Sequence, residues 1–73
     1  MGNDINKSIS LAEAYPLEQM RCRELLEAYK SIGPAGTFGY VMIEQVLQRA
    51  DKAAAEHDTV AMVHSYAEMK ECE

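Results

Sequence analysis

Apolar side chains recur every three or four residues along three stretches of this chain, the spacing that places them on one face of an α-helix. The stretches cover 16–32, 38–56 and 59–71, and charged or amide side chains occupy most of the intervening positions. This pattern predicts an all-α fold, a three-helix bundle with helices over those ranges. Residues 1–9 are polar and have no period, so we predict a flexible N-terminus followed by a single helical domain at 10–73.

Capping residues and proline set the predicted helix boundaries. Ser10 with Glu13 fits the S-x-x-E capping box and predicts a short helical turn before Pro16. Because proline lacks an amide hydrogen and fits best in a first helical turn, we expect the main first helix to begin at Pro16. Asp58 is a suitable N-cap for the last helix, and the short connection before it predicts an αα-hairpin of helices two and three. The acidic end of the last helix opposes the helix dipole, so we expect its last turn to fray unless a partner holds it.

The repeating apolar positions identify the expected core. It comprises Cys22, Leu25, Leu26, Tyr29 and Ile32 in the first helix, Ile43, Val46, Leu47, Ala50, Ala53 and Ala54 in the second, and Met62, Val63, Tyr66 and Met69 in the third. From position 50 onward, alanines make the apolar stripe of the second helix narrower. A neighbouring helix can therefore approach the C-terminal half of the second helix more closely than its N-terminal half.

The segment Ile-Gly-Pro-Ala-Gly-Thr-Phe-Gly, residues 32–39, places three glycines where the first two predicted helices meet. One interpretation is an anion site formed by Gly36, Thr37 and Gly39, because unpaired amides at a helix N-terminus attract negative charge. The segment lacks the lysine of a P-loop, and no strand pattern precedes it. We favour the other interpretation, a connection in which Gly33 ends the first helix in a left-handed conformation and Gly39 lies against another backbone.

The chain is short and acidic, and both properties limit what it can do. A domain of 73 residues buries only about 60% of the surface of its unfolded chain, so we expect it to gain stability by forming a homodimer. A net charge of -5 argues against direct binding of nucleic acid. The longest apolar stretch, Tyr40 to Ile43, is too short to cross a membrane. Two cysteines and no export segment predict free thiols and a cytoplasmic location.

Reactive side chains do not form a recognisable catalytic or metal-binding pattern. His64, Glu68 and Cys72 fall four residues apart on one helix face, but one face cannot surround a zinc ion. Cys22 lies in an apolar stripe, where cysteines usually serve as small hydrophobic side chains. No pair of acids lies in an apolar context that would raise one pKa for acid catalysis, and no Ser-His-Asp pattern has supporting loops. We therefore expect a non-enzymatic protein without catalytic residues, a metal or a cofactor.

Apolar side chains outside the predicted core indicate a second contact surface. Leu17 and Met20 fall on the far side of the first helix, and Val41 lies off the stripe of the second. Phe38 and Tyr40 are displayed where the glycine-rich segment meets the second helix. We predict that these five residues bind a partner, either a second copy of the chain or another protein. Ordinary packing is the alternative, because scattered exposed apolar residues are common.

Residues 50–67 resemble the helix-turn-helix of a tetratricopeptide unit. Small residues fill both helices, Asp58 lies at the turn, and Tyr66 is followed by Ala67. The Trp and Leu-Gly positions of that repeat are absent, and the chain holds no second copy, whereas a solenoid needs about three or more repeats. The resemblance therefore implies only the local hairpin geometry.

Residues 32–73 are similar to small helical accessory proteins of temperate phages and prophages. The likeness rests on the glycine-rich segment, on "Met-Ile-Glu-Gln-Val-Leu-Gln-Arg-Ala" and on "Ser-Tyr-Ala-Glu-Met-Lys". It implies a nonessential intracellular protein that modulates a host or phage protein by binding it, and it transfers no site residue. We accordingly predict a non-enzymatic protein–protein interaction module. The alternative is binding of a small anionic ligand or a nucleotide at the loop from Gly33 to Tyr40.

Overall fold

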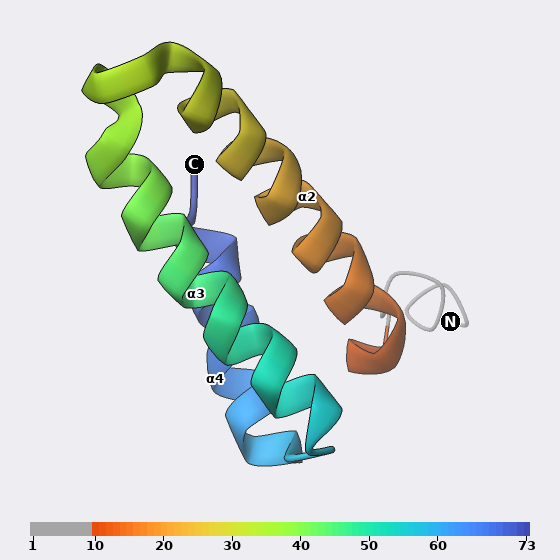
Figure 1. The fold of residues 1–73 in the computed structure, drawn as a ribbon. Coiled ribbons are helices and arrows are strands. Elements are labelled where there is room, and N and C mark those ends of the chain that lie inside the picture. The colour runs from red at the N-terminus through yellow and green to blue at the C-terminus, as the bar shows by residue number, and fades with distance from the viewer. Residues whose placement is uncertain (1–9) are drawn as a thin grey trace, which may run out of the picture.

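The computed structural model describes residues 10–73, and these residues are all-helical without a strand. Their elements are α2 (Leu11–Ile32), the 3-10 helix η1 (Gly33–Gly36), α3 (Thr37–Ala55) and α4 (Thr59–Glu71). In Figure 1, α2 and α3 run in opposite directions and are joined by η1, and α4 returns along α3. Each of the three α-helices contacts the other two. The all-α prediction is confirmed for this part of the chain; the flexible segment predicted at 1–9 lies outside the described residues.

The first helix is longer than predicted. α2 begins at Leu11 and continues through Pro16, so the prediction that it starts at Pro16 is wrong. Ser10 is its N-cap, and the Ser10 Oγ accepts a hydrogen bond from the Glu13 amide at 3.3 Å. Pro16 cannot donate to the carbonyl of Ala12, the partner that a helix would supply. Because Ala12 is exposed, water can reach that carbonyl and reduce the cost of the missing bond.

The extra turns of α2 bring Tyr15 into the core. Tyr15 is the largest fully buried side chain of the described residues, with 1% of its surface exposed. Its hydroxyl donates a hydrogen bond of 2.7 Å to the main-chain oxygen of Ala50 in α3. The short side chain of Ala50 leaves room for that approach. The buried Ser65 of α4 lies beside the same hydroxyl and partly offsets the rise that burial causes in its pKa, so all three helices meet at Tyr15.

The predicted core of α3 is largely confirmed. Its buried residues are Ile43, Val46, Leu47, Ala50 and Ala53, and the fully buried Cys22 and Met69 pack with them. The core prediction is wrong at two positions, because the side chain of Ile32 is 58% exposed and that of Val63 is 52% exposed. α4 turns Met62, Ser65 and Met69 inward at a spacing of three and four residues, which leaves Val63 on its outer side. Ile32 is the last residue of α2.

A three-residue turn joins α3 to α4, as the short connection predicts. His57 adopts a positive φ of 54°, and its amide donates to the Ala54 carbonyl at 3.1 Å. The next amide, of Asp58, donates to the Ala53 carbonyl at 3.0 Å, which completes a Schellman ending of α3. The Asp58 side chain then accepts from the Ala61 amide at 3.1 Å and caps α4, as predicted.

The glycines between α2 and α3 serve different purposes. Gly33 has φ 87° and ψ -148°, so its φ is positive as predicted, although its ψ is extended rather than left-handed helical. Gly36 lies against the main-chain oxygen of Tyr29, where a Cβ would collide. Gly39 lies against the ring of Tyr29, and a Cβ there would be 2.6 Å from a ring carbon. The predicted contact of Gly39 with another backbone is therefore wrong; Gly36 makes that contact.

Candidate protein interface

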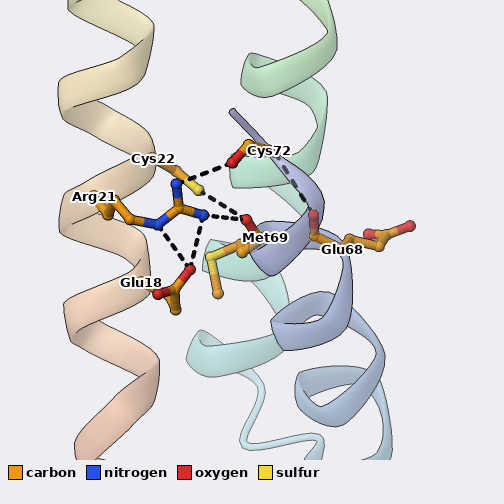
Figure 2. Close-up of polar contacts among 6 residues, drawn as sticks. All are labelled: Glu18, Arg21, Cys22, Glu68, Met69 and Cys72. Carbon is orange, nitrogen blue, oxygen red and sulfur yellow. Dashed lines mark hydrogen bonds and ion pairs between the residues drawn. The ribbon is translucent and has the colours of Figure 1, made fainter.

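Arg21 of α2 reaches across to the C-terminal end of α4. Its guanidinium donates to the main-chain oxygen of Cys72 at 2.9 Å and to that of Met69, as Figure 2 shows. Glu18, one turn earlier on α2, pairs with the same guanidinium at 2.9 Å. The hydrogen bonds that Arg21 donates to the Glu18 carboxylate raise the pKa of Arg21, so the side chain is charged at neutral pH. A fixed positive charge at this helix end satisfies free carbonyls and opposes the negative end of the helix dipole.

Two further α2 side chains hold the same end of α4. The Cys22 thiol donates to the Met69 carbonyl at an S···O distance of 3.6 Å, and the Tyr29 hydroxyl donates to the main-chain oxygen of Glu73 at 2.6 Å. We call Arg21, Cys22 and Tyr29 the C-terminal clamp. The sequence predicts that this end frays unless a partner holds it. In the structure, the clamp of the same chain supplies those contacts.

The two cysteines differ in exposure. Cys22 is 0% exposed, and burial raises the pKa of its thiol to about 11, with a further rise from the neighbouring Cys72 thiol and an opposing effect of Arg21. The Cys22 thiol is therefore protonated at neutral pH. Cys72 is half-buried, and its thiol donates to the Glu68 carbonyl at an S···O distance of 3.6 Å.

An apolar groove opens beyond the end of α4. With 13 residues α4 is about 20 Å long, whereas α3 has 19 residues and is about 29 Å long, so α4 does not cover the half of α3 next to η1. The groove there has a volume of about 480 Å³. Its walls are Tyr29, Phe38, Gly39, Met42, Ile43 and Val46, and its rim is Arg49, Glu68, Glu71, Cys72 and Glu73. We call it the Phe38 groove, because Phe38 is 79% exposed at its edge.

The rim of the Phe38 groove is acidic at the end of α4. Arg49 pairs with Glu68 at 3.2 Å, so these two charges largely neutralise each other. Glu71 and Glu73 are exposed, and neither forms an ion pair within residues 10–73. The groove therefore combines apolar walls with a negative rim.

The structure separates the five predicted partner-binding residues into three places. Phe38 lies at the Phe38 groove. Tyr40 and Val41 line a different depression of about 350 Å³, between α3 and the end of α2. Leu17 and Met20, each 58% exposed, lie outside both depressions on α2. Four of the five are exposed and Tyr40 is half-buried.

Sequence reasoning missed three residues of this region. Met42, 49% exposed, lies one helical turn after Phe38 on the same face, and that spacing is a signal present in the sequence. Tyr29 was assigned to the core, yet its ring also forms a wall of the groove. From the sequence, Arg21 is expected to be an ordinary exposed residue, because its hydrogen-bond partners lie at the other end of the chain.

The predicted anion-binding residues lie in continuous helical backbone. Gly36 is buried and is the N-cap of α3. The Thr37 amide donates to the Pro34 carbonyl, so it is not free for a ligand. Gly39 is covered by the ring of Tyr29. Ligand binding at this segment stays a prediction.

His64 and Glu68 line a polar cleft of about 380 Å³ between α3 and α4, together with Arg49 and Lys52. The carboxylate of Glu68 pairs with Arg49, and Cys72 belongs to the end of α4 beside the clamp. In residues 10–73, no three His, Cys, Asp or Glu side chains are grouped as a metal-binding site. Over the same residues, no helix combines the length and the apolar character needed to cross a bilayer.

Replacing Arg21 with alanine is expected to lower the free energy of unfolding by about 1–2 kcal/mol, because charged hydrogen bonds to two carbonyls are lost. Arg21→Lys should recover little of this, since an ammonium group does not present the planar fork of donors. Urea denaturation followed by circular dichroism measures the change. Amide hydrogen exchange should speed up selectively at the end of α4.

Arg23 provides the matched control on the same helix. It pairs with Asp51 at 2.7 Å, but both side chains are about half exposed, so Arg23→Ala should cost less than about 0.5 kcal/mol. If Arg21→Ala and Arg23→Ala had equal effects, the clamp would contribute no more than a surface ion pair.

The site combines exposed apolar side chains with charged groups. Its most exposed large apolar side chain is Phe38, and its charged groups lie on the rim, where they can orient a partner. Its buried thiol is protonated at neutral pH. No protein-family model matches the chain, and neither a curated protein sequence nor a solved structure does.

Proposed function

We propose that this chain is a non-enzymatic protein–protein interaction module and that its Phe38 groove binds an apolar segment of another protein that carries lysine or arginine. In this proposal α2, α3 and α4 form a three-helix bundle that acts as a rigid support. The single observation that carries the proposal is the uncovered apolar groove with a negative rim beyond the end of α4.

The apolar part of the groove supports an anchoring role. Phe38 is 79% and Met42 is 49% exposed, and the ring of Tyr29 closes the floor beside Gly39. An exposed aromatic ring next to a pliable methionine is costly to leave in water and adapts to varied apolar partners. Burial of such side chains commonly dominates the affinity of an interface.

The charges support a basic partner. Glu71 and Glu73 lie at the rim where α4 ends, and the chain carries a net charge of -5. Complementary charge speeds encounter and fixes orientation more than it raises affinity. A second copy of this acidic chain would bring like charges to the rim, so we favour a different protein as the occupant of the groove. An amphipathic helix suits a groove of this kind.

The proposal predicts selective binding of a basic amphipathic peptide. The probe is a synthetic peptide with leucines at helical spacing and lysines on its polar face, and the comparison peptide has glutamates in place of the lysines. We expect the lysine peptide to bind more tightly, and Phe38→Ala to weaken its binding at least about tenfold. Calorimetry measures the affinity, and nuclear magnetic resonance shifts locate the site.

Val60→Ala is the matched control, because Val60 is also an exposed apolar residue but lies outside the groove. It should leave peptide affinity within a factor of two or so. Equal affinity for the two peptides, or equal effects of Phe38→Ala and Val60→Ala, would exclude the Phe38 groove as the binding site.

We also propose that the chain forms a homodimer through the outward face of α2. Leu17 and Met20 lie one turn apart there and are each 58% exposed. Burying them against a second copy would add apolar contact to a small core. Light scattering should give the mass of a dimer for the purified chain and of a monomer for the double variant Leu17→Asp, Met20→Asp; a monomeric parent chain would refute this.

The biological setting is also a proposal. We propose a cytoplasmic accessory protein of the temperate-phage type, which modulates a host or phage protein by occupying one of its basic segments. The likeness of residues 32–73 to such proteins supports the phage setting. The negative rim of the Phe38 groove supports binding to a basic segment. Affinity capture from the native host with the parent chain, compared against Phe38→Ala, would identify the partner.

A further inference from the structure

The two cysteines of the chain lie together although they are about 50 residues apart in the sequence. The Cys22 thiol contacts the Met69 carbonyl, and the Cys72 thiol contacts the adjacent Glu68 carbonyl, each at 3.6 Å. The neighbouring Cys72 thiol also adds to the rise in the pKa of Cys22 that burial causes. In Figure 2, Cys22 extends from α2 toward the last turn of α4, where Cys72 lies.

We propose that Cys22 and Cys72 are a dithiol pair that hydrogen peroxide converts to an intramolecular disulfide, which fixes the end of α4 covalently to α2. Cys72 follows the last residue of α4 and has extended backbone, φ -73° and ψ 131°, so it can adjust to the narrow geometry that a disulfide requires. Cys22 is completely buried, so Cys72 of the same chain reaches it more readily than any other molecule does. This inference does not depend on the proposed function.

The order of the reaction follows from exposure. Half-buried Cys72 meets peroxide first: its thiolate attacks one oxygen, the O–O bond breaks, and hydroxide leaves as Cys72 becomes a sulfenic acid. The Cys22 sulfur then attacks the Cys72 sulfur, the S–S bond forms and the S–O bond breaks. The departing hydroxide takes the Cys22 proton and leaves as water. In total, two thiols and one peroxide give one disulfide and two waters.

The high pKa of Cys22, raised to about 11 by burial, makes the second step slow at neutral pH, because the thiol rather than the thiolate is present. Once formed, the bond closes a loop of about 50 residues, which removes much of the freedom of the unfolded chain. We therefore expect a slow reaction and a strongly stabilised product.

The test treats the purified full chain with hydrogen peroxide and uses Cys72→Ser as the control. We expect a mass loss of two hydrogen atoms, a proteolytic peptide pair joined through Cys22 and Cys72, and a thermal midpoint raised by more than about 10 °C. A reductant should reverse the changes, and Cys72→Ser should show none of them. Disulfide-linked dimers, a sulfinic acid on Cys72 with Cys22 free, or a linked chain with an unchanged midpoint would each overturn the proposal.

Discussion

Replacing Tyr15 with alanine is expected to lower the free energy of unfolding by about 3–5 kcal/mol, the cost typical of deleting a buried aromatic ring. The ring is 1% exposed, and its hydroxyl donates to the Ala50 carbonyl at 2.7 Å. A domain of this size has only about 3–5 kcal/mol of stability from its core. Tyr15→Ala should therefore be largely unfolded at 25 °C, as circular dichroism and thermal denaturation would show.

Tyr15→Phe separates the ring from the hydroxyl. It keeps the packing and removes the hydrogen bond to the Ala50 carbonyl, so we expect a loss of about 1 kcal/mol with the helical spectrum retained. If Tyr15→Ala cost no more than Tyr15→Phe, the ring would not be a core residue and α2 would begin later, at Pro16, as the sequence suggests.

The start of α2, at Pro16 in the prediction but before Tyr15 in the structure, could not be predicted from the sequence. Local preference places a helix start at Pro16, because proline interrupts the hydrogen-bond ladder. The structure continues α2 across it, since the residues before Pro16 gain a buried ring and contacts to two other helices. Those contacts join positions 35 or more residues apart, and a periodic pattern within one segment does not contain them.

α3 was predictable for the opposite reason. Its apolar stripe is regular, and its alanines lie next to the turn that leads to α4. Asp58 is a clear N-cap for that next helix. Each of these signals is local, and each agrees with the packing. Helix propensity, periodicity and tertiary contact therefore indicate the same boundaries to within one residue at both ends of α3.

The candidate site was predictable in part. Phe38 was predictable as an aromatic residue displayed where the glycine-rich segment meets the second helix. The contacts of Arg21 with Met69 and Cys72 were not predictable, because an arginine among glutamates matches a solvated surface. Its role depends on how α2 and α4 are placed side by side, which requires the fold itself.

Raising the pH from 7 to 10 is expected to lower the free energy of unfolding by about 1 kcal/mol through Cys22 alone, and by about 2–3 kcal/mol once this thiol is fully ionised. Chiefly because it is buried, the thiol has a pKa of about 11 in the folded chain, compared with 9.0 for a free thiol. Between these two values the unfolded chain has released the proton and the folded chain has not. Hydroxide therefore favours the unfolded state, and stability falls as the pH rises through this window.

Urea denaturation at several pH values, in the presence of a reductant that keeps both thiols free, measures this loss. At pH 7 the Cys22→Ala variant should be less stable than the parent chain. Between pH 7 and pH 10, however, its free energy of unfolding should fall by about 1 kcal/mol less than that of the parent chain. Cys72→Ala should keep most of the parent's pH dependence, because burial outweighs the Cys72 thiol in raising the pKa of Cys22. The pKa of Tyr15 is also raised, chiefly by burial. The stability lost through Tyr15 begins above the ordinary tyrosine pKa of 10.0, and it is the same in all three chains. Identical slopes for Cys22→Ala and the parent chain would mean that water reaches this thiol, and that the contact between α2 and the end of α4 is open in solution.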